Sequence, residues 1–275
     1  MTNDPVTNVG VPVRHLEPQE RAQRAGSFGE VASNYERYRP GPPLAAVHWI
    51  LPTRVGTVVD LGAGTGQLTR LLLDRADVVY AVEPDDGMRS VLTDAIPDVR
   101  AIKGWGESIP IPDGSADAVV ASSSWHWMDP VLALHEVGRV LKPGGFLGAV
   151  WSGPEPLGPM FLHAQTLVAK RDEEFTGVIT RDAHRPTSKL QIAHGVQFDQ
   201  PQHEVFRWHV ALDADHLIGL LGTFSWIITL PDDRRERALA EARRLLRDAL
   251  GIQGEVTIDI PFRADAWRSR HHDRA

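Results

Sequence analysis

With 275 residues, of which 42% are hydrophobic, the chain is long enough for one large core domain with an elaboration. Its 29 Lys and Arg residues against 36 Asp and Glu residues give a net charge of −7, which disfavours nucleic-acid partners, and its lack of cysteine excludes disulfides and thiolate metal sites. No apolar run reaches the ~20 residues of a membrane helix or forms a signal peptide, so we expect a soluble, cytoplasmic protein with no membrane span and no metal site.

The first half of the chain alternates between helix-like and strand-like segments. Residues 1–26 are polar and aperiodic, and we interpret them as a flexible tail. From residue 27 to residue 151, apolar residues recur at helical spacing in segments 44–50, 68–72, 88–96 and 134–141, and we expect Pro143-Gly144-Gly145 to end the last helix. Between them stand short apolar runs typical of buried strands: Thr57–Leu61, Val78–Val82, Val99–Ile102, Asp117–Ala121 and Phe146–Val150. This alternation predicts βαβ units, a parallel sheet and right-handed crossovers.

The second half is less regular. Residues 152–204 form a variable cover segment, with a helical pattern at 158–170 and no clear period beyond it. We expect residues 205–275 to complete the sheet with two strands, Val205–Leu212 and Val256–Ile260, which form an antiparallel edge. Helices are predicted at 213–221 and 232–250, and the paired histidines His271-His272 are expected in a solvated terminus.

The most informative segment is a glycine-rich turn, Asp60-Leu61-Gly62-Ala63-Gly64-Thr65-Gly66. A predicted strand ends at Asp60, and a helix is predicted to begin near Thr65. Glycines in such a turn allow positive φ angles and let a ligand approach the backbone closely. Because ligands of open α/β sheets bind outside the carboxyl ends of the strands, this turn is a candidate binding site.

The spacing of the glycines and the acids around them narrow the choice of ligand class. The dinucleotide fingerprint is G-x-G-x-x-G, but here Gln67 stands where its third glycine would be. Asp60 would repel a pyrophosphate at the helix N-terminus, whereas it would attract a cationic group. Glu83 follows the next predicted strand, 19 residues after Gly64, where a carboxylate can accept from both hydroxyls of a ribose. Met88 either packs on an adenine face or fills the core.

Four motifs in this order resemble those of class I S-adenosylmethionine-dependent methyltransferases, and most closely the type 11 group that includes quinone-biosynthesis methyltransferases. They are Asp60–Gly66, Glu83, Gly106–Pro110 and Leu141–Gly145. The resemblance covers Ser27–Trp151. It implies an α/β fold with a Rossmann-like, doubly wound, mostly parallel seven-stranded sheet. It also implies S-adenosyl-L-methionine as cofactor, S-adenosyl-L-homocysteine as product, and in-line methyl transfer to a small-molecule acceptor.

The resemblance assigns roles to the residues of the glycine turn and the acid that follows it. Asp60 and Gly62 would lie near the amino group of the methionine moiety. Ala63 and Gly64 would approach the nucleoside, and Glu83 would hold the ribose.

Other cofactor contacts implied by the resemblance come from further along the sheet and from the N-terminal part. Gly106 and Glu107 would flank the adenine, and Ser122 would lie beside the sulfonium. Trp105 stands where many relatives have an acid that bonds the adenine amino group, and it either stacks on the ring or packs in the core. Arg39 either pairs with the methionine carboxylate or lies on a helix surface. It belongs to an aromatic lead-in expected to fold over the cofactor: Phe28, Ala32, Tyr35, Tyr38, Arg39 and Pro40.

The segment after the fourth predicted strand, Ser122–Pro130, would face the methyl group. Its His126 could accept a proton from the acceptor near neutral pH, or it could only pack or hydrogen-bond the cofactor. Trp125 and Trp127 either line an apolar pocket for an aromatic or lipophilic acceptor or are buried under residues 151–204, and Trp151 either lines the same pocket or packs in the core.

Two other functions stay open at this point. A nicotinamide-dependent (NAD) oxidoreductase is disfavoured by the glycine spacing and by Asp60. A fold relative that binds the cofactor without catalysis is the second alternative. We expect a monomer or homodimer with a small-molecule methyl acceptor whose nucleophile, oxygen, carbon or nitrogen, is undetermined, and with no nucleic-acid partner.

Overall fold

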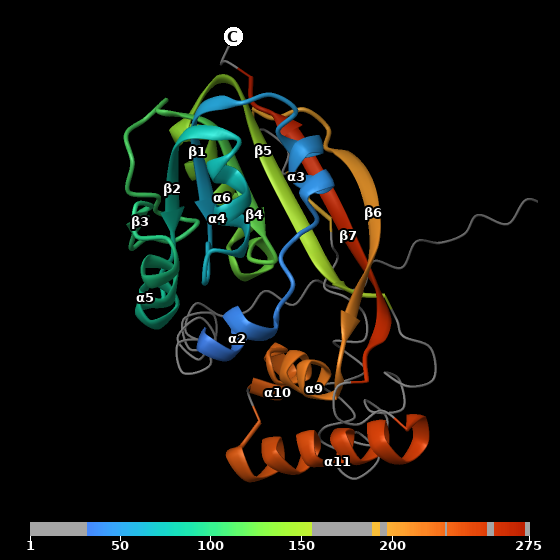
Figure 1. Cartoon of the computed structure of the whole chain (residues 1–275). Coiled ribbons are helices and arrows are strands. Elements are labelled where there is room, and N and C mark those ends of the chain that lie inside the picture. Colours follow the sequence, from blue (N-terminus) through green and yellow to red (C-terminus); the bar gives the residue numbers. More distant parts are fainter. Residues whose placement is uncertain (1–31, 156–188, 193–196, 229, 252–255, 273–275) are drawn as a thin grey trace, which may run out of the picture.

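The computed structural model describes residues 32–155, 189–192, 197–228, 230–251 and 256–272. The expected tail 1–26, Phe28 and the helical pattern at 158–170 lie outside the described residues. A seven-stranded mixed sheet in the order β3-β2-β1-β4-β5-β7-β6 forms the centre of the fold (Figure 1). Its strands are β1 (Val55–Leu61), β2 (Ala76–Val82), β3 (Arg100–Ile102), β4 (Ala116–Ser122), β5 (Leu141–Pro154), β6 (Gln202–Leu212) and β7 (Ile258–Arg270).

The order of the strands places a topological switch in the middle of the sheet. β1 pairs in parallel with β2 on one side and with β4 on the other, and the parallel pairing continues from β2 to β3 and from β4 to β5. The chain leaves β3 at one edge and returns to the far side of β1 to form β4, which confirms the doubly wound sheet. Ligands of such sheets bind beside the switch, here at the ends of β1 and β4 near Leu61 and Ser122.

The C-terminal strands form the predicted antiparallel edge, but with different bounds. β7 is antiparallel to both β5 and β6. It starts at Ile258 and ends at Arg270, whereas the sequence pattern indicated a strand at 256–260 only. Pro261 and the charged residues after it interrupt the apolar pattern, while pairing on both sides extends the strand through them. β5 is also longer than predicted, because the preceding helix ends at Val140 and Pro143-Gly144-Gly145 already lies in the strand.

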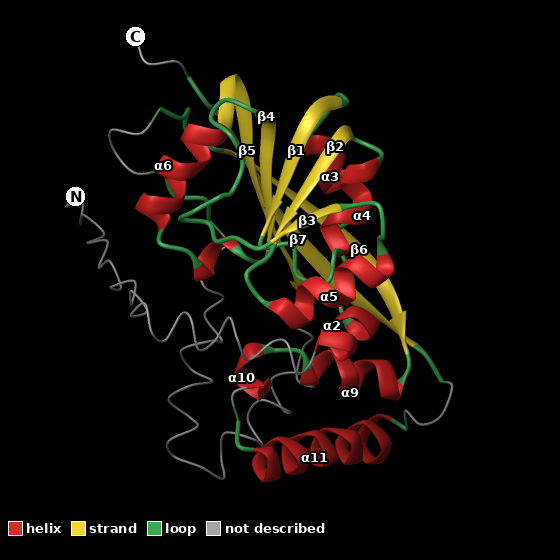
Figure 2. Ribbon diagram, turned by 90° about the vertical axis from the view of Figure 1, so that its left-hand side faces the viewer, coloured by secondary structure: helices red, strands yellow, loops and turns green. Residues whose placement is uncertain are grey.

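Helices cover both faces of the sheet (Figure 2). α3 (Leu44–Ile50), α4 (Gln67–Leu73) and α5 (Asp86–Ala95) lie on one face, and α6 (Pro130–Val140) lies on the other. Val58 and Val59 are both fully buried, because Val58 packs on the α3 and α4 side and Val59 packs on the α6 side. Burial on both faces explains why the parallel strands are continuous apolar runs in the sequence.

A second group of helices gathers at the carboxyl ends of the central strands (Figure 1). It consists of α2 (Ala32–Tyr38), α9 (Ala214–Gly222), α10 (Ser225–Ile228) and α11 (Asp232–Leu250). Asp213 caps α9 by accepting from the backbone N–H of His216 at 2.8 Å, as expected for an acid before a helix. None of the described helices is long and apolar enough to cross a membrane.

The C-terminal histidines are not both solvated, contrary to the expectation. His271 is buried, and its ring centroid lies 5.1 Å from that of Phe198. An isolated bridge between these two residues continues the sheet beyond β7, which explains the burial. His272 is exposed, with Nε2 2.6 Å from Oδ1 of Asp199.

Candidate functional site

The glycine-rich turn after β1 has the backbone geometry that its sequence predicts. Gly62, Gly64 and Gly66 have φ angles of 70°, 57° and 93°, in the left-handed region. At Gly62 a Cβ atom would lie 2.5 Å from Cβ of Ser124, so the turn runs directly over this buried serine, whose hydroxyl donates to the Leu61 carbonyl at 2.6 Å. At Gly64 a Cβ atom would have nothing within 4 Å. A ligand can therefore approach the turn at Gly64.

Asp60, the penultimate residue of β1, carries a fully buried carboxyl group beneath the turn. The Thr69 hydroxyl donates to its Oδ2 at 2.6 Å, whereas Oδ1 has no hydrogen-bond partner among the described residues. Burial raises the pKa of Asp60 from 3.8 to about 7, and the nearby charge of Glu83 adds to the effect. This carboxyl group thus lacks one partner and would gain from a cation.

Glu83, the residue directly after β2, supports the turn from the other side. Its Oε2 accepts from the N–H of Gly64 at 2.8 Å, and its Oε1 accepts from the N–H of Asp85 at 2.9 Å. Burial raises the pKa of Glu83 despite these bonds. Each carboxylate oxygen has two lone pairs, so Glu83 can still accept from a ligand hydroxyl while it holds the turn.

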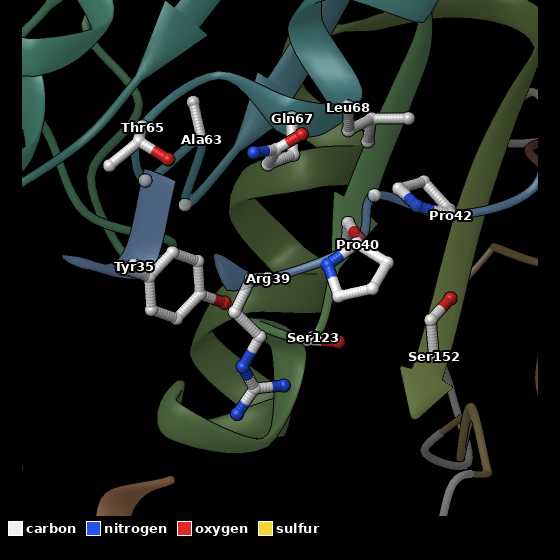
Figure 3. Close-up of a pocket in the computed structure, with 14 residues that line it drawn as sticks. Tyr35, Arg39, Pro40, Pro42, Ala63, Thr65, Gln67, Leu68, Ser123 and Ser152 are labelled. Carbon is white, nitrogen blue, oxygen red and sulfur yellow. The ribbon is translucent and has the colours of Figure 1, made fainter. Parts of the chain in front are cut away.

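A pocket opens above the turn, between the N-terminal segment and the ends of β4 and β5 (Figure 3). It brings together part of the predicted cofactor set: Tyr35, Arg39, Gly62, Ala63, Gly64 and Ser122. Its other lining residues are Pro40, Gly41, Pro42, Thr65, Gln67, Leu68, Ser123 and Ser152.

Two hydroxyl groups of the pocket were not expected from the sequence. The Oγ1 of Thr65 and the Oγ of Ser152 are buried without a partner among the described residues. Buried polar atoms are normally hydrogen-bonded, so both are candidates for ligand contacts. Thr65 lies within the glycine motif and could have been found there, whereas Ser152 depends on the unexpected length of β5.

The C-terminal part of α2 and the residue after it are bound to two different parts of the fold. Within α2, the Glu36 carboxylate pairs with Arg70 of α4 at 2.5 Å, and the Glu36 carbonyl accepts from Nε2 of Gln67 at 3.1 Å. Just after α2, Nε of Arg39 donates to the hydroxyl of Thr223, just beyond α9, at 3.0 Å, and the Arg39 guanidinium lies 4.5 Å from the ring centroid of Phe224. The wall of the pocket thus depends on both the core and the C-terminal helices.

The Arg39 guanidinium points away from Ala63 and Thr65 of the turn (Figure 3). Its bonds to the hydroxyl and the carbonyl of Thr223, at 3.0 and 3.4 Å, agree with this direction. The guanidinium therefore faces Thr223 beyond α9 rather than the glycine turn.

The predicted adenine and ribose residues Glu83, Met88, Gly106 and Glu107 do not line this pocket. Met88 is buried in α5, and a Cβ atom at Gly106 would overlap the side chain of Met128. Oε1 of Glu107 accepts from the N–H of Asp129 at 2.6 Å. The segment after β3 is therefore fixed against the segment after β4, while Trp105 beside it is 51% exposed.

The predicted catalytic and acceptor residues lie around His126, in the short 3₁₀ helix η2 (Trp125–Trp127). Trp125 and Trp151 are buried in the core on the α6 side, and none of the three predicted tryptophans lines the pocket. The ring of half-buried Trp127 lies 4.6 Å from that of His126. Nε1 of Trp151 donates to Nδ1 of His126 at 3.2 Å.

The surroundings of His126 keep its imidazole neutral. Burial, assisted by the positive charge of Arg39, lowers the pKa of His126 from 6.5 to about 4. The lone pair on Nδ1 is already occupied by the indole N–H of Trp151, so of the two roles left open for His126 this geometry favours hydrogen bonding over action as a base.

Comparisons with known proteins agree with the motifs. A family model described as a methyltransferase domain matches residues 59–149. An uncharacterized methyltransferase of Mycobacterium tuberculosis is 36% identical over 237 residues, which cover 86% of this chain and 92% of that protein. A demethylmenaquinone methyltransferase of Paenarthrobacter aurescens is 28% identical over 152 residues, 55% of this chain and 59% of that protein.

A solved structure from Anaeromyxobacter dehalogenans, provisionally described as a type II methyltransferase, shares the fold. It has a TM-score of 0.56 and 23% identity, and the match covers 86% of this chain and 100% of that one. The mycobacterial relative matches over nearly its whole length, well beyond the region of the sequence motifs. The chain therefore belongs to the class I S-adenosylmethionine-dependent methyltransferases, the family that its motifs resemble.

Proposed function

We propose that the protein transfers the methyl group of S-adenosyl-L-methionine, the cofactor of its family, to a small-molecule acceptor, and that the cofactor binds in the pocket of Figure 3. One observation carries the assignment of the pocket. At the switch of a doubly wound sheet, an open glycine turn stands over a buried carboxyl group whose Oδ1 has no partner among the described residues.

The residues present fit the cofactor. Asp60 would attract its cationic amino group, and the Thr65 hydroxyl would gain a polar partner. Glu83 would accept from the ribose hydroxyls while it supports Gly64. When bound, the cofactor supplies a methyl group on a sulfonium sulfur, and the chain supplies position and exclusion of water. Further proposed contacts that line the pocket are Tyr35, Gly62, Ala63 and Ser122. Met88, Gly106 and Glu107 do not line it and are proposed to contact the adenine end of a cofactor that extends beyond the pocket.

Calorimetric titration with S-adenosylhomocysteine and with NAD tests the cofactor assignment. We expect binding of S-adenosylhomocysteine and no binding of NAD. Tight binding of NAD without S-adenosylhomocysteine would overturn the proposal in favour of an oxidoreductase. Binding of S-adenosylhomocysteine without methyl transfer to any acceptor would favour the non-catalytic alternative.

The fastening of α2 leads to a prediction about cofactor release. Glu36→Ala removes the ion pair with Arg70, so α2 should open more often and the affinity for S-adenosylhomocysteine should fall about threefold to tenfold, mainly through faster dissociation. Stopped-flow displacement measures this rate. Arg54→Ala, which removes an exposed ion pair with Asp77, is the matched control and should leave the dissociation rate unchanged.

A further inference from the structure

We propose that His126 donates a hydrogen bond from Nε2 to the methyl acceptor, that Trp151 holds it in this donating tautomer, and that with Arg39 it selects a carboxylate as the nucleophile. The inference rests on the proposed function, because it assigns the acceptor of the same site. It gives His126 the role of a binding group and Trp151 the role of a positioning residue.

The tautomer follows from the partner of Nδ1. An indole nitrogen can only donate, so Nδ1 of His126, 3.2 Å from Nε1 of Trp151, must present its lone pair. A neutral imidazole then carries its proton on Nε2. Nε2 has no hydrogen-bond partner among the described residues and is not one of their fully buried unpartnered atoms, so its N–H is free to donate to a ligand.

Strand pairing and core packing hold Trp151 in place. It is buried in β5, in register with Asp265 of β7, and it packs in the core on the α6 side. The indole N–H is thus carried by a central strand rather than by a loop. The bond gives the His126 ring a fixed orientation on the segment that follows β4.

Arg39 supplies the charge that favours an anion here. Its positive charge acts on His126, and among the described residues no acidic side chain has a comparable effect on this imidazole. Its two bonds to Thr223 use two of the five guanidinium N–H groups, which leaves three that can bind an oxygen anion. A guanidinium fork beside a neutral N–H donor complements the two oxygens of a carboxylate.

The chemistry of a carboxylate explains why a donor, rather than a base, suffices. A carboxylate oxygen supplies the electron pair of the new O–C bond, the S–C bond breaks with its pair staying on sulfur, and no proton moves. The products are a neutral methyl ester and the thioether S-adenosylhomocysteine. A phenol or an ammonium acceptor would instead release one proton for each methyl group transferred.

Nitrogen NMR of the full-length protein labelled at histidine tests the tautomer without any acceptor. We expect the His126 resonances of a neutral ring protonated at Nε2 from pH 6 to pH 8. Trp151→Phe should yield a mixture of tautomers, whereas Trp125→Phe, an equal truncation of a neighbouring buried tryptophan, should leave the wild-type pattern. A wild-type ring protonated at Nδ1, or a charged ring at pH 7, would overturn the inference.

A transfer assay tests the acceptor. We expect methyl transfer to members of a set of aliphatic, aromatic and dicarboxylic acids, without proton release to a pH indicator, and none to their amides. His126→Gln, which keeps a donor but cannot act as a base, should stay within about tenfold of wild-type kcat/KM, and His126→Leu should lose at least about 100-fold, mainly through KM. Equal losses in both variants would contradict the inference. So would a failure to methylate any of the acids, whether or not phenols or amines are methylated. If the wild-type protein does not bind S-adenosylhomocysteine, the proposed function itself is contradicted.

Discussion

Replacement of Asp60 by Asn is expected to weaken S-adenosylhomocysteine binding by about 100-fold at pH 8, because a buried, charge-assisted contact to the cofactor amino group is lost. The same change should stabilise the free protein. Asp60 is fully buried, and only its Oδ2 has a hydrogen-bond partner among the described residues, so above pH 7 it holds a poorly compensated charge. Calorimetry measures the affinity, and urea denaturation measures the free energy of unfolding.

The raised pKa of Asp60 determines whether the stability of the protein and its affinity for the cofactor rise or fall with pH. The folded state keeps a proton between pH 3.8 and about 7 that the unfolded chain loses, so the Asp60 contribution to stability falls as pH rises across this range. The Asn variant avoids this loss, which at pH 8 is at most about 4 kcal/mol. A bound cation favours the ionised carboxylate, so the affinity of the wild type should rise toward pH 7 by up to about tenfold per pH unit.

Thr69→Val changes the pKa of Asp60 while it keeps the carboxyl group, so it tests whether the charge of Asp60 controls cofactor binding. The Thr69 hydroxyl bond lowers the pKa of Asp60, so its removal should shift the affinity curve to higher pH without abolishing the plateau. The affinity of the Asn variant should not rise with pH in this way, because it has no carboxyl group to ionise. An Asn variant that binds as tightly as the wild type at pH 8 would refute the role of Asp60.

Two glycines of the same turn should respond very differently to alanine. Gly62→Ala should lower the free energy of unfolding by on the order of 3 kcal/mol, because strain at φ 70° adds to a clash with Cβ of Ser124. Gly64→Ala should cost only about 1 kcal/mol, since φ is 57° but no atom lies near the new methyl group. Its methyl group would enter the pocket, so Gly64→Ala should mainly weaken cofactor binding. Urea denaturation and calorimetry measure the two effects.

A double variant isolates the clash at Gly62. Ser124→Gly removes the Cβ atom that the new methyl group would meet, although it also removes the bond to the Leu61 carbonyl. The double variant should therefore be more stable than the sum of the single effects implies. Strict additivity would show that backbone strain alone accounts for the loss.

The parts of this fold that were predictable are those with a local cause. Glycines at Gly62 and Gly64 and an acid at Asp60 are close in the chain, and one strand and one helix suffice to place them. The helix at 232–250 was predicted with its observed bounds, because its charged residues and flanking proline and glycine are visible in the sequence.

The parts that were not predictable depend on distant partners. The extent of β7 is set by pairing with two strands, and its own residues show no continuous pattern. The tautomer of His126 is decided by Trp151, 25 residues away, and the direction of Arg39 by Thr223, 184 residues away. Neither residue of such a pair shows in the sequence that it contacts the other. The roles of His126 and Arg39 therefore could not be decided from the sequence.

The bond between Arg39 and Thr223 has a consequence for the order in which the protein is made. Thr223 follows Arg39 by 184 residues, so this second attachment of the pocket wall cannot form until most of the chain has been synthesised. The segment from β1 to β4, which leaves the ribosome earlier, could form the central strands without a complete site. We therefore expect the cofactor to bind late, stabilising a finished fold rather than guiding the nascent core.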